Sequence, residues 1–127
     1  MSYLFDPRGG LIVLPVELEG PSGSAIVRLA LDTGATGTLI NNAILVSLGY
    51  DPSLASARIQ VTTGSKVESV PRIIVQRLTA LGKYRVRFPV LAHTLPPSAG
   101  VDGLLGLDFL QGHKLTVDFT KGVVVLK

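Results

Sequence analysis

The chain has 127 residues, of which 46% are hydrophobic and 17% are charged, and its formal net charge at pH 7 is +3. This length predicts a single domain spanning residues 1–127, and the apolar content excludes a disordered chain. The charge is too small to indicate nucleic-acid binding by itself. The sequence contains no cysteine and two histidines. We therefore exclude disulfides, thiol catalysis and cysteine-bound zinc, and we expect no metal and no cofactor.

The sequence also predicts where the protein resides. No apolar run approaches the roughly 20 residues that a membrane-spanning helix requires. Asp6, Pro7 and Arg8 lie where a signal peptide would carry its apolar core. We expect an unprocessed, cytoplasmic protein that does not contact a membrane. Its mean hydropathy of +0.45 is high for a small domain, which predicts that a partner subunit covers some apolar surface.

Short strands joined by tight turns dominate the predicted secondary structure, because apolar and β-branched residues are interrupted by 14 glycines and eight prolines. In chain order, strands are predicted over residues 11–18, 25–31, 58–61, 66–70, 73–78, 83–91, 115–119 and 123–126. A helix over 41–48 follows the second strand, with Asn41 or Asn42 as its N-cap and Gly49 at its end. A second short helix is predicted over 104–111. The expected fold is all-β with one or two short helices.

A carboxylate follows the second predicted strand directly, in the run Leu31-Asp32-Thr33-Gly34-Ala35. Gly34 allows the backbone to turn tightly and to approach another chain or a ligand closely. An aspartate in this position is also typical of an Asx-turn, in which the carboxylate only closes the turn. The motif alone therefore leaves a catalytic and a structural interpretation open.

A second motif, Leu-Leu-Gly at 104–106, precedes the second predicted helix. This motif, the Asp-Thr-Gly-Ala motif at 32–35 and Thr38 occur in an order and spacing that resemble the retroviral-type (retropepsin-like) aspartic protease family. The resemblance extends over about residues 10–127. It implies an all-β, retropepsin-like closed barrel or sandwich with its active site at a two-fold dimer interface.

The activity implied by this resemblance is that of an aspartic endopeptidase. Each subunit of a homodimer would supply one Asp32, and the two carboxylates would activate a water molecule that hydrolyses a peptide bond. By the same resemblance, Thr33 braces the two active-site loops and the Gly34 carbonyl accepts a hydrogen bond from bound peptide. Ala35 leaves room for the peptide backbone, and Thr38 belongs to the same substrate-binding loop.

Three other segments take roles from the resemblance. The tip of the hairpin at 61–70, with Thr63 and Gly64, falls where the family carries its flap. The last strand, Val123–Leu126, is expected to pair with its symmetry mate in the dimer. The residues that support the active-site loop from beneath are Leu104, Leu105 and Gly106.

Several charged residues have simpler interpretations. Asp108 is expected to cap or brace the final helix. Lys83, Arg85 and Arg87 alternate with apolar residues, which predicts a solvated face of one strand. His93 has no partner that the sequence reveals.

Two rival functions remain open at this stage. A catalytically idle dimer would use the same cleft to bind an extended peptide without cleaving it. A nucleic-acid binder would use the basic strand face, and its affinity would fall steeply with salt. The sequence favours the protease, with a second copy of the chain and a peptide or protein substrate as its partners, and with no nucleic acid.

Overall fold

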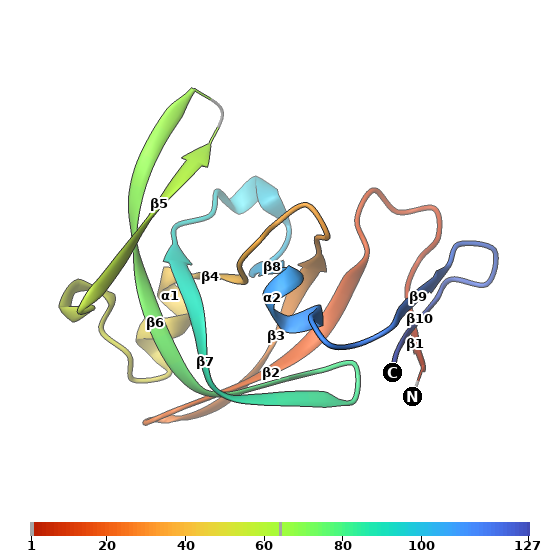
Figure 1. Cartoon of the computed structure of the whole chain (residues 1–127), viewed down its shortest axis with the longest axis horizontal. Helices are drawn as coiled ribbons and strands as arrows, with labels where there is room; N and C mark the ends of the chain where they lie inside the picture. Colours follow the sequence, from red (N-terminus) through yellow and green to blue (C-terminus); the bar gives the residue numbers. More distant parts are fainter. Residues whose placement is uncertain (1, 64) are drawn as a thin grey trace.

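The computed structural model describes residues 2–63 and 65–127, and these residues form ten strands, two short α-helices and two 3-10 turns. Figure 1 shows their arrangement. No helix in the described ranges has the length and apolar character needed to cross a membrane. The elements are β1 (Ser2–Leu4), β2 (Val13–Gly20), β3 (Gly23–Leu31), β4 (Leu39–Asn41), α1 (Asn42–Ser47), η1 (Pro52–Leu54), β5 (Ala57–Thr63), β6 (Lys66–Ala80), β7 (Lys83–His93), η2 (Pro97–Ala99), β8 (Gly103–Leu105), α2 (Leu107–Leu110), β9 (Leu115–Asp118) and β10 (Val123–Leu126).

Seven of these strands form one sheet in the order β2-β3-β8-β4-β7-β6-β5. A further antiparallel ladder joins β2 to β6, with Leu18 opposite Leu78. This ladder closes the sheet into a barrel and leaves β5 outside it. The closed all-β barrel with two short helices confirms the predicted fold class.

The barrel forms because the apolar side chains of its strands alternate inward. On β2, for example, Leu14, Val16 and Leu18 are fully buried, whereas the residues between them are exposed. These side chains belong to one core cluster that extends from Leu14 to Leu126 and includes Phe109 of α2. The core therefore joins the barrel, the second helix and the C-terminal strands.

The strand β6 is longer than predicted. The sequence predicts separate strands over 66–70 and 73–78, but β6 runs without interruption through Pro71. Pro71 pairs with Arg58 of β5, and the ladder between β6 and β7 begins at Arg72. The proline therefore removes no hydrogen bond from the β6–β7 ladder, which explains why it does not end the strand.

The two predicted helices are both present, and both are shorter than expected. Helix α1 covers Asn42–Ser47, and the Asn41 side chain accepts a hydrogen bond from the Ala43 N–H as its N-cap. Helix α2 covers only Leu107–Leu110. Its predicted first turn is instead the strand β8, which lies between β3 and β4 in the sheet. Tertiary pairing has overridden the local pattern there.

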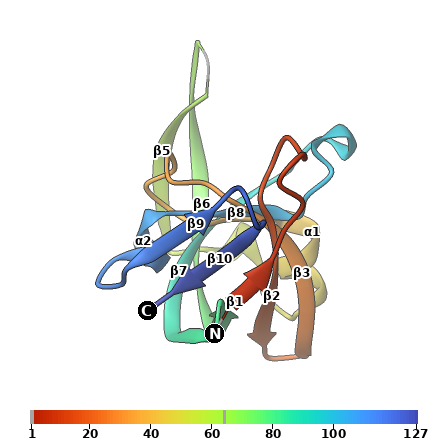
Figure 2. The ribbon, with the colours of Figure 1, turned by 90° about the vertical axis from the view of Figure 1, so that its right-hand side faces the viewer.

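The chain termini form a separate sheet in the order β1-β10-β9, which faces the viewer in Figure 2. The strand β10 is the central strand, because Ser2–Leu4 of β1 pairs with one edge and β9 pairs with the other. Both edges of Val123–Leu126 are thus already paired within the chain, so the prediction that this strand pairs with its symmetry mate is wrong. The sequence did not reveal β1, whose three residues occupy the edge in question.

The three cations of the predicted basic face do not share one environment. The Arg85 guanidinium donates hydrogen bonds to the Phe109 carbonyl at 2.8 and 3.2 Å and to the Gln111 carbonyl at 2.6 Å. Arg85 thus caps the C-terminal end of α2, where a cation is favourable. Arg87 is exposed and has a φ of 49°. The prediction of a solvated face is wrong for Arg85, because the C-terminal end of α2 packs beside it.

Candidate active site

Asp32 lies where the chain leaves β3 and enters the loop before β4. Its backbone N–H donates to the Leu105 carbonyl of β8 at 3.0 Å, and its own carbonyl accepts from the Ala35 N–H at 3.2 Å. Its carboxylate oxygen Oδ1 accepts the Gly34 N–H at 2.8 Å. The Asx-type turn is therefore present. The turn fixes the direction of a half-buried carboxylate, so the structural and the catalytic interpretation are compatible.

The two sequence motifs meet directly beneath this turn. The strand β3 runs parallel to β8, with Leu31 opposite Leu105. The Leu107 N–H donates to the Ala35 carbonyl at 2.8 Å. At Gly106, an added Cβ would lie 2.7 Å from the backbone of Gly37, so only glycine fits without displacing the loop. The second motif thus forms the floor on which the loop at 32–38 rests.

Thr38 holds the far end of this loop and does not face a substrate. The residue is fully buried, with 0% of its surface exposed. Its hydroxyl donates to Asp108 Oδ1 at 2.7 Å and accepts the Gly106 N–H at 3.1 Å. Its backbone N–H donates to Asp108 Oδ2 at 3.1 Å. The prediction of a substrate-binding role for Thr38 is therefore corrected, because the residue is buried and its polar groups bind Asp108, Gly106 and, through its carbonyl, the Leu91 N–H of β7.

Asp108 has a larger role than the sequence indicates. It lies in the first turn of α2, as expected for a bracing residue, and Oδ1 accepts the Phe109 N–H at 2.9 Å. Its two carboxylate oxygens also bind Thr38 across 70 residues of sequence. Sequence spacing gives no sign of this contact, because it depends on the parallel pairing of β3 with β8.

We expect Asp108→Ala to lower the free energy of unfolding by about 1–3 kcal/mol, since the polar groups of buried Thr38 would lose their acceptors. Asp108→Asn keeps an acceptor for the Thr38 hydroxyl, but its amide N–H would face the Thr38 backbone N–H, so it retains part of the contact and its loss should be smaller than that of the alanine variant. Urea unfolding of the two variants and the wild type measures the difference. Equal losses for the alanine and asparagine variants would contradict the bracing role.

A cleft of about 430 Å³ opens between the loop at 32–38 and the strand β5. The loop contributes Gly34, Ala35 and Gly37 to its lining, and β5 contributes Ile59 and Val61. The remaining lining residues are Thr36, Leu39, Gln60, Thr62, Leu91 and Leu104. The cleft is largely apolar, with backbone groups of the loop along one side.

The predicted flap is the β5–β6 hairpin, which projects from the barrel at the upper left of Figure 1. Thr63 ends β5 and pairs with Lys66 at the start of β6. Gly64, the other flap residue predicted from the sequence, lies outside the described residues. Among the residues predicted to support the loop, Leu104 lines the cleft, whereas Leu105 is fully buried in the core.

Thr33 lies on the surface beside a second hollow. Thr33 is exposed, and it lines this hollow together with Leu107, Leu110 and Leu115. Leu107, the first residue of α2, is 37% exposed. An apolar surface therefore adjoins the Asp32 turn on the side of α2. Within the described residues, no three His, Cys, Asp or Glu side chains gather closely enough to hold a metal ion.

The chain belongs to the aspartyl protease family, because a sequence model of that family matches residues 14–109. A retropepsin-like aspartic protease from Rickettsia conorii has a similar structure, with a TM-score of 0.74 and 16% sequence identity. That comparison covers 99% of this chain and 88% of the other. The retroviral protease-like domain of Ddi1 from Leishmania major matches with a TM-score of 0.63 and 18% identity, over 94% and 90% of the two chains. No curated protein matches the sequence.

These comparisons confirm the family predicted from the sequence, and the solved structures confirm its retropepsin-like fold. The matched range contains both motifs, the Asp-Thr-Gly-Ala turn at 32–35 and the Leu-Leu-Gly floor at 104–106. It also contains the whole β5–β6 hairpin. The protein is thus an aspartyl protease family member with a retropepsin-like fold.

Proposed function

We propose that residues 1–127 form a single aspartic endopeptidase domain that acts as a homodimer. The observation that carries this proposal is the position of Asp32. Its carboxylate is held by an Asx-type turn. Two residues of this turn, Gly34 and Ala35, line an apolar cleft beneath a projecting hairpin. A turn that served only to connect β3 and β4 would not require such a cleft beside it.

Hydrolysis by an activated water requires two carboxylic groups in different protonation states. One ionised carboxylate accepts a proton from the water, and one protonated carboxyl donates to the carbonyl oxygen of the scissile bond. The chain supplies one Asp-Thr-Gly turn. A second copy, related by a two-fold axis, would supply the other Asp32 and so complete the site.

The reaction then proceeds in two steps with no covalent link to the protein. The water oxygen bonds to the carbonyl carbon, its proton passes to one Asp32, and the carbonyl oxygen takes the proton of the other. The tetrahedral diol then breaks its C–N bond while the carboxyl proton moves to the leaving nitrogen, and one diol hydroxyl gives its proton to the other, ionised carboxylate. An acid and an amine are released, and the pair of carboxyls again shares one proton.

The surface around Thr33 supports the dimer. Exposed Thr33 and Leu107 border the Asp32 turn, and an apolar patch of this kind is typical of a contact between subunits. Because β10 is paired on both edges, a partner that joins the terminal sheet would meet the outer edge of β1 or β9. A second copy facing Thr33 would bring the two Asp32 turns together.

The cleft favours an extended peptide with an apolar side chain. Leu39, Val61 and Leu91 contribute apolar surface to its lining, against which an aliphatic residue of the substrate would be desolvated. The loop backbone at Gly34 offers polar groups to the peptide main chain. These two features match a substrate that is recognised partly by its backbone and partly by one side chain.

Incubation of the purified protein with a diverse peptide mixture over a pH series tests this function. We expect cleavage that stops when a peptide analogue of the tetrahedral diol is added. Peptides that bind without being cleaved at any pH would instead indicate the idle peptide-binding dimer. Binding of nucleic acid that weakens with salt would indicate the third alternative.

A further inference from the structure

The β5–β6 hairpin over the cleft separates from the barrel where the ladder between β6 and β7 ends, at the pair Arg72 and Leu91. We call this point the fork. Beyond this pair β6 continues toward the hairpin tip with β5 as its partner, whereas β7 continues beside β4, with His93 opposite Asn41. Residues 66–71 of β6, which we call the hairpin arm, therefore leave the barrel at the fork.

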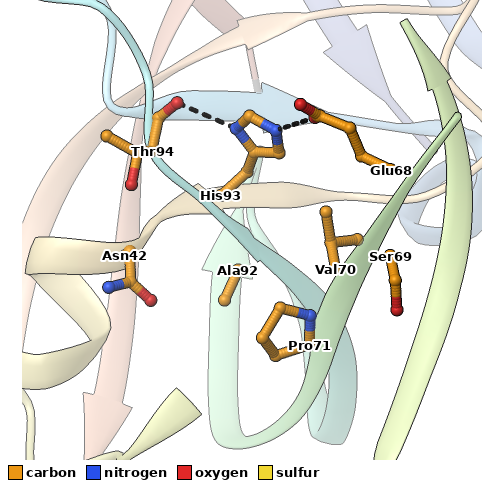
Figure 3. A pocket seen from close by; sticks show the side chains of 8 residues that line it. All are labelled: Asn42, Glu68, Ser69, Val70, Pro71, Ala92, His93 and Thr94. Carbon is orange, nitrogen blue, oxygen red and sulfur yellow. Dashed lines mark hydrogen bonds and ion pairs between the residues drawn. The ribbon is translucent and has the colours of Figure 1, made fainter. Parts of the chain in front are cut away.

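One side-chain contact bridges this fork. His93 Nε2 lies 2.8 Å from Glu68 Oε2, so the last residue of β7 is joined to the hairpin arm. Figure 3 shows the pair across the hollow between the two strands. The side chains are 27% and 41% exposed, which leaves them accessible to solvent and to protons. The sequence reveals no partner for His93, whereas the structure shows that this partner is Glu68.

The two polar contacts of the imidazole favour its protonated form. The Nδ1 atom of His93 lies 2.8 Å from the carbonyl oxygen of Thr94, and Nε2 faces the Glu68 carboxylate. The Thr94 carbonyl and the ionised Glu68 carboxylate are both acceptors, so both contacts are satisfied only when both ring nitrogens carry hydrogen. A neutral imidazole has one N–H and can satisfy only one of these contacts. The arrangement therefore fits the imidazolium cation.

We propose that Glu68 and His93 form a proton-dependent clasp that positions the β5–β6 hairpin over the cleft. The clasp is closed when His93 is protonated, because the cation then donates to both acceptors. When His93 loses its proton, one contact is lost together with the charge attraction to Glu68. The arm beyond the fork is then held less firmly to the barrel.

The direction of the pH response follows from the partners of His93. The hydrogen bond to Glu68, and then that to the Thr94 carbonyl, raise the pKa of His93 above its ordinary value of 6.5. The clasp is therefore fully closed below about pH 6.5 and is lost as the pH rises through this higher folded-state pKa. The hairpin should loosen in alkaline solution.

Two further charged side chains lie on the hairpin beside Glu68. Arg58 of β5 is bonded to Ser69, and Lys66 shares a strand face with Glu68. The other residues that line the hollow carry no titratable side chain, namely Asn42, Ser69, Val70, Pro71, Ala92 and Thr94. The transition thus belongs to the His93–Glu68 pair.

Hydrogen exchange of the β5–β6 amides in the intact protein, corrected for intrinsic rates, tests the clasp at about pH 6 and pH 8.5. An accessible pair of this kind predicts about two- to five-fold weaker protection at the higher pH. His93→Gln should give weak protection at both values, and Glu68→Gln should do the same from the other side. His93→Lys, which keeps a cation throughout, should remove the loosening. His113→Gln is the control and should retain the wild-type response.

Equal protection of the hairpin amides at the two pH values in the wild type would overturn the clasp. A pH-dependent protection that persists in His93→Gln would also overturn it. The clasp rests on the proposed function only in treating this hairpin as the flap. Exchange is measured without substrate, so a failure to hydrolyse peptides leaves its result unaffected. In the active enzyme, the clasp further predicts that KM rises with pH in the wild type and not in His93→Lys.

Discussion

Replacing Asp32 with asparagine should abolish most peptide hydrolysis and leave the fold intact. The amide keeps an oxygen that can accept the Gly34 N–H, so the turn seen at 2.8 Å can persist. It can neither take a proton from water nor share one with its mate, and general acid–base catalysis is typically worth about 10²- to 10⁴-fold in rate. Steady-state kinetics on a cleaved peptide, together with thermal unfolding, measures both halves of the expectation.

Asp51→Asn is the matched control for this substitution. Asp51 is an exposed aspartate that accepts the Ser53 N–H at the start of η1, so the same chemical change is made in the same kind of turn. Its turnover should equal that of the wild type. Near-normal turnover in Asp32→Asn would show that Asp32 is not the catalytic acid.

A side chain at Gly106 should have the largest effect on stability among the site substitutions. A Cβ there would lie 2.7 Å from the backbone carbon and oxygen of Gly37 and 2.9 Å from the Ala35 carbonyl oxygen. These atoms are main chain, so the loop itself must move, and the Leu107–Ala35 hydrogen bond would be strained. We expect Gly106→Val to lower the free energy of unfolding by about 3 kcal/mol.

Urea unfolding of Gly106→Val and of Gly10→Val makes this comparison. Gly10 has no atom within 4 Å of an added Cβ, so the same substitution meets open space. Its stability should remain near that of the wild type. Equal losses at the two positions would contradict the interlocking of the two motifs.

The sequence predicted most elements of the fold because local rules decide them. The hairpin at β9–β10 follows from two apolar runs around Thr120-Lys121-Gly122, and helix α1 follows from its Asn41 cap. The missing elements depend on distant partners. Nothing in Ser2–Leu4 marks it as a strand until β10 provides an edge for it. The length of β6 likewise depends on where its neighbours begin.

The candidate site shows the same division. The Asp-Thr-Gly-Ala motif predicted that Asp32 lies in a turn, because the hydrogen bonds of that turn join residues within the motif itself. The contact between Thr38 and Asp108, by contrast, joins residues 70 positions apart. The pair of His93 and Glu68 is separated by 25 positions, across a fork that no residue pattern reveals. Side-chain contacts between elements follow from the register of the barrel, which periodicity alone does not specify.

The shared site is the central claim, and one measurement tests it most directly. Sedimentation velocity and peptide turnover are recorded on the same samples over one dilution series, with excess Asp32→Asn protein added to a parallel set. We predict that specific activity falls together with the dimer fraction, and that the variant suppresses wild-type activity by forming pairs with one carboxylate. An active species that sediments as a monomer, with turnover unaffected by the variant, would contradict this account.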